Sequence, residues 1–192
     1  MLPLFDRNPT RKVPLVTMGL IAVNAIVFVY MLFLSSKQYD IFIYRFSTVP
    51  WEIVHAEQLP AYALQQLFGF PLESVPSKPV YLSLVTSMFL HGGWLHILGN
   101  MLFLWIFGNN VEDVMGHLGF IVFYMACGVF GILAHVAIYS NSLNPLLGAS
   151  GAISGVLGAY LLLYPRAWVW TWVLIVIVPI PAYVVIGFWI VL

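Results

Sequence analysis

Long stretches of this sequence carry no charged side chain, and this feature limits the possible folds more than any other. Only 7% of the 192 residues are charged and 62% are hydrophobic, whereas a soluble domain carries about 25% charged residues. Too few charges are present to cover a water-exposed surface, so the chain is predicted to lie in a lipid bilayer. Because a lipid-exposed backbone must satisfy its own hydrogen bonds, we expect an all-α, multi-pass transmembrane helical bundle without β-sheet.

Five apolar segments are candidate membrane spans, since crossing a ~30 Å hydrocarbon core takes ~20 helical residues. The first segment is too long for a secretory signal and has no cleavage site. The fourth is short and rich in Gly and Ala, which favours the middle of a bundle. We therefore predict a cytoplasmic N-terminal segment, residues 1–13, and one transmembrane domain, residues 14–192, with five spans. The spans are Pro14–Leu34, Tyr81–Phe107, Leu118–Tyr139, Leu147–Tyr164 and Ala167–Leu192.

Basic residues near the ends of the spans predict the orientation. Arg7, Arg11 and Lys12 precede the first span, and Arg166 lies between the fourth and the fifth. With alternating topology these residues share one side, which the positive-inside rule places in the cytoplasm. We expect an integral protein of a prokaryotic plasma (inner) membrane. The formal net charge of zero argues against nucleic acid as a partner, because phosphate binding needs clustered Lys and Arg.

The first connecting segment, Ser35 to Pro79, is too long for a simple connector. It is rich in aromatic residues and is divided by prolines into short amphipathic stretches. Aromatic side chains at this density are typical of the headgroup region. We predict a folded element of short helices that lies partly embedded in the outer interface.

Two clusters of polar residues interrupt the apolar spans, where polar residues are energetically expensive. Residues 91–100 read HGGWLHILGN. His96 and Asn100 are one helical turn apart on one face, so their side chains can donate hydrogen bonds toward a single point. His91 lies beyond the glycine pair and would not share that face in a regular helix.

The second cluster, residues 148–155, reads GASGAISG. Gly151, Gly155 and Gly158 fall on one stripe with the small-xxx-small spacing that allows close helix packing. Taken alone, the segment is explained by packing, with the Ser150 hydroxyl bonded back to its own helix.

Together the clusters indicate chemistry. With alternating topology, the second and fourth spans both enter from the outer side, so His96, Asn100 and Ser150 lie at similar depth. A serine beside two side-chain donors fits acyl transfer, in which the serine attacks a carbonyl and the donors stabilise the oxyanion.

Both clusters closely resemble the rhomboid family of intramembrane serine proteases. Residues 89–100 match its H-x4-H-x3-N pattern, and Gly148 to Gly151 match its G-x-S-G. The resemblance implies a Ser–His enzyme without metal or organic cofactor that cleaves transmembrane segments of single-pass or multi-pass membrane proteins. Ser150 would be the nucleophile, and His96 and Asn100 would form the oxyanion hole. The candidate accessory residues are His91, Gly148, Gly151 and Ser154.

Two features of the family are missing. Its catalytic base is a histidine on a sixth helix, in a pattern like A-H-x-G-G, and this sequence ends at Leu192 in the fifth span. We expect that helix to pack on the glycine stripe, and we expect the 192-residue chain as given to have little or no protease activity. The family's Trp-Arg pair reads Leu82-Ser83 here. His135, in the third span, is better explained as an interhelical polar residue than as the base.

Two other functions stay open. A catalytically inactive rhomboid-like pseudoprotease would bind transmembrane segments without cleaving them, which the missing base favours. A channel or transporter would need broken helices at the midplane, for which Pro179 and Pro181 are the only hint. A zinc site is not expected, since His91 and His96 lack H-E-x-x-H spacing.

Overall fold

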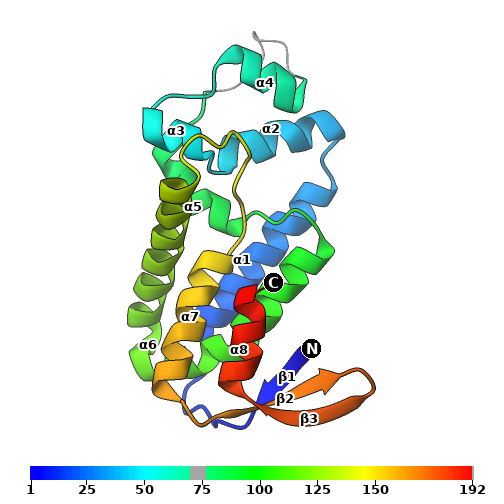
Figure 1. Cartoon of the computed structure of the whole chain (residues 1–192), viewed down its shortest axis with the longest axis vertical. Coiled ribbons are helices and arrows are strands. Elements are labelled where there is room, and N and C mark those ends of the chain that lie inside the picture. The colour runs from blue at the N-terminus through cyan, green and yellow to red at the C-terminus, as the bar shows by residue number, and fades with distance from the viewer. Residues whose placement is uncertain (70–76, 192) are drawn as a thin grey trace.

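The computed structural model describes residues 1–69 and 77–191, and it is predominantly helical (Figure 1). This confirms the predicted helical bundle. Within these described residues, two helices, α1 and α6, are long and apolar enough to cross a membrane. The helices are α1 (Leu15–Leu32), α2 (Ser36–Phe46), α3 (Pro50–His55), α4 (Ala61–Phe68), η2 (Val80–Leu82), α5 (Ser83–Thr86), η3 (Ser87–Phe89), α6 (Trp94–Ile138), α7 (Ser150–Leu163) and α8 (Ala182–Val191); the strands are β1 (Leu2–Asp6), β2 (Trp168–Val173) and β3 (Val176–Pro181).

The helix α6 contains two predicted spans joined without a loop. Its helical geometry is interrupted at Gly116, where φ is 73° and ψ is 164°. Glycine suits this position because a positive φ is costly for other residues. The two halves of α6 run in opposite directions from this break (Figure 1). The second half agrees with the predicted third span.

The second span differs from its prediction, because its helix begins at Trp94 and not at Tyr81. Short turns of η2, α5 and η3 come first, and Leu90 is extended. Glycine is a poor helix former, and the Gly92-Gly93 pair separates these turns from α6. At the other end the helix continues past Phe107 up to Gly116.

The expectation of no β-sheet is wrong, and so is the expectation of a helical fifth span. The strands form a sheet in the order β1-β2-β3, with both pairs antiparallel. The sequence of β2, WVWTWV, is made of aromatic and β-branched residues, which favour strands. Pro179 and Pro181 lie on the edge strand β3, the place where a sheet tolerates proline. The N-terminal segment is therefore structured as well, because β1 pairs with β2.

The long first connection is folded, as predicted. It contains α2, α3 and α4, stacked at one end of the bundle (Figure 1). A buried ion pair links Glu52 of α3 to Lys78, and both side chains are 0% exposed. Glu52 also accepts a hydrogen bond from the Leu59 amide at 3.0 Å. The predicted embedding of this element in the outer interface stays a prediction, and residues 70–76 lie outside the described part.

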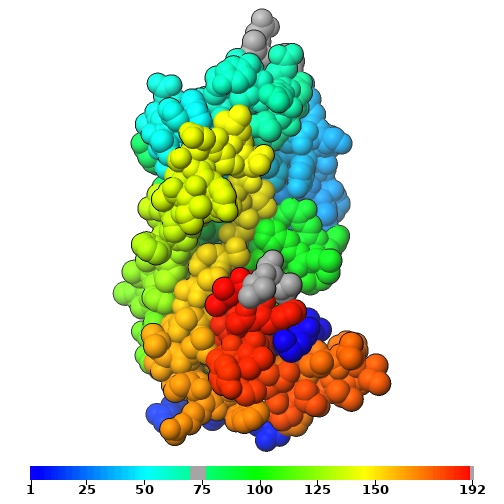
Figure 2. All heavy atoms as spheres, viewed as in Figure 1, coloured from blue at the N-terminus to red at the C-terminus, as the bar shows by residue number. Residues whose placement is uncertain are grey.

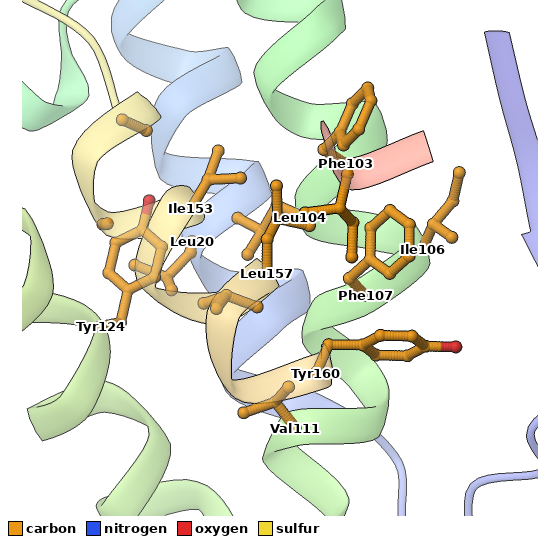
Figure 3. Packing of buried hydrophobic residues seen from close by; sticks show 14 of the residues in the cluster. Leu20, Phe103, Leu104, Ile106, Phe107, Val111, Tyr124, Ile153, Leu157 and Tyr160 are labelled. Atoms are coloured by element: carbon orange, nitrogen blue, oxygen red, sulfur yellow. The ribbon is translucent and has the colours of Figure 1, made fainter. Parts of the chain in front are cut away.

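The main core lies between α1, the first half of α6 and α7. Figure 3 shows Leu20, Leu104, Phe107, Ile153 and Leu157 meeting there, and all of them are buried. Burial of apolar side chains in a close-packed interior fixes the relative positions of these helices. The same packing fixes the positions of the first turns of α6 and α7 relative to each other.

Polar contacts anchor the opposite end of the bundle. The Glu112 carboxylate accepts hydrogen bonds from the amides of Val16 (2.9 Å) and Thr17 (2.8 Å) in the first turn of α1. These amides have no acceptor within their own helix. The contact therefore ties α6 to the beginning of α1.

The N-terminal strand is anchored through Asp6. Its Oδ2 atom accepts hydrogen bonds from Tyr160 of α7 at 2.7 Å, Asn110 of α6 at 2.9 Å and Asn8 at 3.0 Å. Burial raises the pKa of Asp6, and the hydrogen bonds from Tyr160 and Asn8 offset part of that rise. In Figure 2 the N-terminal residues lie against α8 on the same face of the molecule.

Candidate active site

The structure brings Ser150, His96 and Asn100 to one cavity of about 900 Å³. His96 and Asn100 lie in the first turns of α6, and Ser150 is the first residue of α7. Ser154 also lines the cavity, and the rest of the wall is mainly apolar. That wall is formed by Met1, Leu2, Leu95, Gly99, Phe103, Trp189 and Ile190.

The imidazole of His96 lies against the turn that leads into α7. A β-carbon built on Gly148 would come within 2.7 Å of His96 Nε2, and Gly148 has φ +121°. On the other side of the ring, Nδ1 accepts a long hydrogen bond of 3.4 Å from the Gly92 amide. An accepting Nδ1 places the proton of the neutral ring on Nε2. His96 therefore presents an N–H donor to the side on which the Gly148 turn lies.

Asn100 is buried, and its amide is only partly used. Nδ2 donates to the backbone carbonyl of His96 at 2.8 Å. An amide nitrogen carries two hydrogens, so one N–H remains for a ligand. Among the described residues, Asn100 Oδ1 has no hydrogen-bond partner.

Ser150 is exposed, at the N-terminal end of α7. The first amides of a helix have no acceptor within the helix, and the helix dipole adds partial positive charge at that end. The backbone N–H groups next to Ser150 are therefore further donors, which side-chain motifs did not reveal. Within residues 1–69 and 77–191, no hydrogen bond to a histidine is formed by the Ser150 hydroxyl.

His91 lies beside the cavity rather than in its wall. Its ring is fully buried and packs edge-on against His96, with 4.9 Å between the ring centroids. Gly148 lies at the His96 ring and Ser154 lies in the cavity wall, and their accessory roles stay predictions.

Part of the glycine stripe of α7 packs against the second half of α6. A β-carbon on Gly151 would lie 3.5 Å from the Gly131 Cα, and one on Gly155 would lie 2.4 Å from the Cys127 Sγ. These two glycines thus face the second half of α6. They also border an apolar groove of about 640 Å³, and the expected packing of a sixth helix on the stripe stays a prediction. Of the three glycines in the stripe, only Gly158 has open space at its β-carbon position.

The remaining histidines are engaged away from the cavity. His135 packs against Tyr139, with ring centroids 4.7 Å apart, and lines a different cavity. His55 bonds to the Trp51 carbonyl, and His117 bonds to Glu112 at 2.6 Å. In the described part of the chain, no three His, Cys, Asp or Glu side chains are grouped closely enough to hold a metal ion.

Comparison with known proteins agrees with the family resemblance of the sequence motifs. A family model described as a rhomboid domain matches residues 78–192. Rhomboid protein 1, mitochondrial, of Saccharomyces cerevisiae is 36% identical over 112 residues, which are 54% of this chain and 30% of that protein. Rhomboid protease GluP of Bacillus subtilis is 38% identical over 94 residues, 49% of this chain and 18% of that protein.

Rhomboid-like protein 11, chloroplastic, of Arabidopsis thaliana is 33% identical over 91 residues, 47% of this chain and 31% of that protein. The aligned regions thus cover less than a third of each of these three relatives. Two of them carry organellar names, so these matches do not support the predicted prokaryotic membrane. No solved structure matches this chain.

Proposed function

This chain belongs to the rhomboid family of integral membrane proteins, and from this premise we propose that it is an intramembrane serine endopeptidase with Ser150 as its nucleophile. The substrates are membrane proteins, cleaved within or next to a transmembrane segment. A relative that carries the name protease, GluP, aligns with 49% of this chain.

One observation supports the proposal most: Ser150, His96 and Asn100 line the same cavity although they lie on two different helices. In the proposed reaction, the Ser150 Oγ attacks the scissile carbonyl carbon and its proton passes to a base. The carbonyl oxygen becomes an oxyanion. His96 Nε2–H, the free Asn100 N–H and the first amides of α7 then stabilise this charge.

The proposal assigns the base to a histidine on a further helix, as the resemblance to the family implies. The hydroxyl of serine is a weak nucleophile until a base within hydrogen-bonding reach accepts its proton. His96 is in contact with the turn before Ser150, and its position fits oxyanion binding.

A second candidate function is a catalytically inactive rhomboid-like protein that binds transmembrane segments. It is favoured by the exposed Ser150 hydroxyl, which makes no hydrogen bond to any described histidine. The apolar wall of the cavity suits a transmembrane segment in either case, because such a segment carries mainly apolar side chains.

The test uses the protein extended by the further helix that carries the proposed base, in proteoliposomes with a fluorescent single-pass transmembrane substrate and a serine-reactive fluorophosphonate probe. Ser150→Ala should abolish cleavage and labelling, whereas Ser36→Ala, which changes an exposed serine on α2, should leave both intact. Equal cleavage by wild type and Ser150→Ala would exclude Ser150 as the nucleophile. Binding of the substrate without cleavage by either protein would support the second candidate.

A further inference from the structure

The segment that leads to Ser150 is bonded to a part of the chain far away in sequence. The Leu146 amide donates to the Thr48 carbonyl at 2.7 Å, and the Thr48 amide donates to the Leu146 carbonyl at 3.1 Å. This isolated antiparallel bridge joins the end of α2 to the loop before α7. The loop is therefore held at one point two residues before Gly148.

A second bond holds the turn itself. The Gly148 amide donates to the Ser87 carbonyl at 2.9 Å. Ser87 belongs to η3, one of the short turns that precede α6. The position of Gly148 thus depends on the position of η3.

The side chains of Thr48 and Ser87 connect these two bonds. Their hydroxyl oxygens are 3.0 Å apart, and Thr48 Oγ1 also lies 2.9 Å from the Ser83 carbonyl. A hydroxyl has one hydrogen. Because only Thr48 can donate to the Ser83 carbonyl in this arrangement, Ser87 donates to Thr48. Thr48 is 0% exposed and Ser87 is 1% exposed, so water does not replace either partner.

We propose that Thr48 and Ser87 are positioning residues that hold the turn at Gly148 and so place Ser150 opposite His96. The proposal rests on the proposed function of Ser150. Gly148 is in contact with the His96 ring, and Ser150 follows two residues later. Movement of this turn would change the position of the nucleophile and of the ring that stabilises the oxyanion. Misplacement of reacting groups by about 1 Å can lower a rate by about 10²-fold.

Thr86 provides a matched control on the same segment. Its hydroxyl donates to the Phe46 carbonyl at 2.7 Å, so it also links the segment before α6 to the end of α2. It makes no contact with the Gly148 turn among the described hydrogen bonds. Thr48→Val and Thr86→Val therefore each remove a side-chain hydrogen bond between the same two segments, but only Thr48→Val should loosen the Gly148 turn.

The first experiment measures hydrogen exchange by mass spectrometry in peptides that cover residues 146–152. Loss of one buried hydrogen bond should speed exchange of the Gly148 amide about five- to tenfold in Thr48→Val and Ser87→Ala. In Thr48→Ser, which keeps the hydroxyl, the Gly148 amide should exchange at nearly the wild-type rate. The same rate is expected in Thr86→Val. Unchanged exchange in Thr48→Val would overturn the proposal.

The second experiment measures the Tm and the kinetics of substrate cleavage of the same variants in the protein extended by the further helix that carries the proposed base. Thr48→Val should lower kcat about tenfold with KM within about twofold of wild type, because positioning acts on the reaction step. Thr86→Val should lose a similar amount of Tm and keep its kcat. Equal loss of kcat in both variants would reduce Thr48 to a structural role and overturn the proposal. Where the protein with its further helix does not cleave the substrate, the proposed function fails, and the exchange measurement still decides whether these residues hold the turn.

Discussion

The His96 imidazole and the Gly148 backbone are in direct contact, so that a β-carbon on Gly148 would lie only 2.7 Å from His96 Nε2. This contact joins the polar cluster of α6 to the turn before Ser150. It explains why a glycine is needed before the serine: the residue has φ +121° and faces a ring.

Gly148→Ala should therefore both destabilise the protein and impair the cavity. The positive φ costs about 1–3 kcal/mol for a residue with a side chain, and the methyl group must displace His96. Gly158→Ala is the control, because its β-carbon meets nothing within 4 Å and alanine favours a helix interior by about 1 kcal/mol. Thermal unfolding in detergent should show a lower Tm for the first variant only. A similar Tm for both would contradict the contact.

Loss of either side-chain donor should slow cleavage without unfolding the protein. Removal of one oxyanion donor lowers kcat about 10²–10³-fold, and we expect this for His96→Ala and for Asn100→Ala. Asn141→Ala, at an exposed loop position, should retain full activity. The prediction is checked by measuring how fast the protein with its further helix cleaves a fluorescent transmembrane substrate. Near-normal kcat in both cavity variants would remove these residues from the oxyanion hole.

Gly155→Ala should weaken the contact between α7 and α6. The added methyl would lie 2.4 Å from Cys127 Sγ, and overpacking costs about 1–3 kcal/mol. Gly158→Ala again serves as the control on the same helix. Denaturation in mixed micelles should rank Gly155→Ala as the least stable of the three proteins. If Gly155→Ala matched wild type, the close approach of the two helices would be wrong.

The buried ion pair of Glu52 and Lys78 predicts that a single variant loses more stability than the double variant. Burial lowers the pKa of Lys78, and the Glu52 carboxylate opposes that shift. Lys78→Met leaves a buried carboxylate without its partner and should cost about 3–5 kcal/mol. In the double variant Glu52→Gln/Lys78→Met no charge remains, and the glutamine can still accept from Leu59, so most of the stability should return. Equal losses in the single and the double variant would mean that the charges are not paired.

Asp6 should make stability depend on pH. Burial raises its pKa above the ordinary aspartate value of 3.8, so between the ordinary pKa and the raised pKa the folded state binds more protons than the unfolded state. Stability therefore falls as the pH rises through this window and is constant above it. Asp6→Asn should remove this fall, whereas Asp40→Asn should not. Denaturation midpoints measured at several pH values from about 3.5 to 7 check the difference; parallel curves for wild type and Asp6→Asn would refute it.

Hydropathy and turn residues predicted most of the helical elements. Three predicted spans agree closely with α1, the second half of α6 and α7. The three residues expected to share a site line one cavity, because periodicity places His96 and Asn100 on one face and helix order places Ser150 nearby. The catalytic roles of these residues stay predictions.

Hydropathy failed where it could not separate strand from helix. Residues 168–181 are as apolar as a membrane helix, yet their aromatic and β-branched residues and two prolines favour a hairpin. The contact of Gly155 with Cys127 was not predicted, because spacing along one helix does not show which neighbour it faces. Ser87 could have been noticed, since it is a polar residue inside a predicted span; Thr48 lies in a connecting segment and gave no such signal.

Because the first half of α6 is one continuous helix, the number of residues within it matters for the contacts at its two ends. Asn100 near one end reaches the cavity, while Glu112 near the other end binds the amides at the start of α1. Each added residue turns one end of a helix by about 100° relative to the other. An insertion or deletion between these two positions would therefore rotate Asn100 out of the cavity or Glu112 away from α1, whereas a substitution leaves both side chains in place. This stretch should tolerate changes of apolar side chain far better than any change in its number of residues.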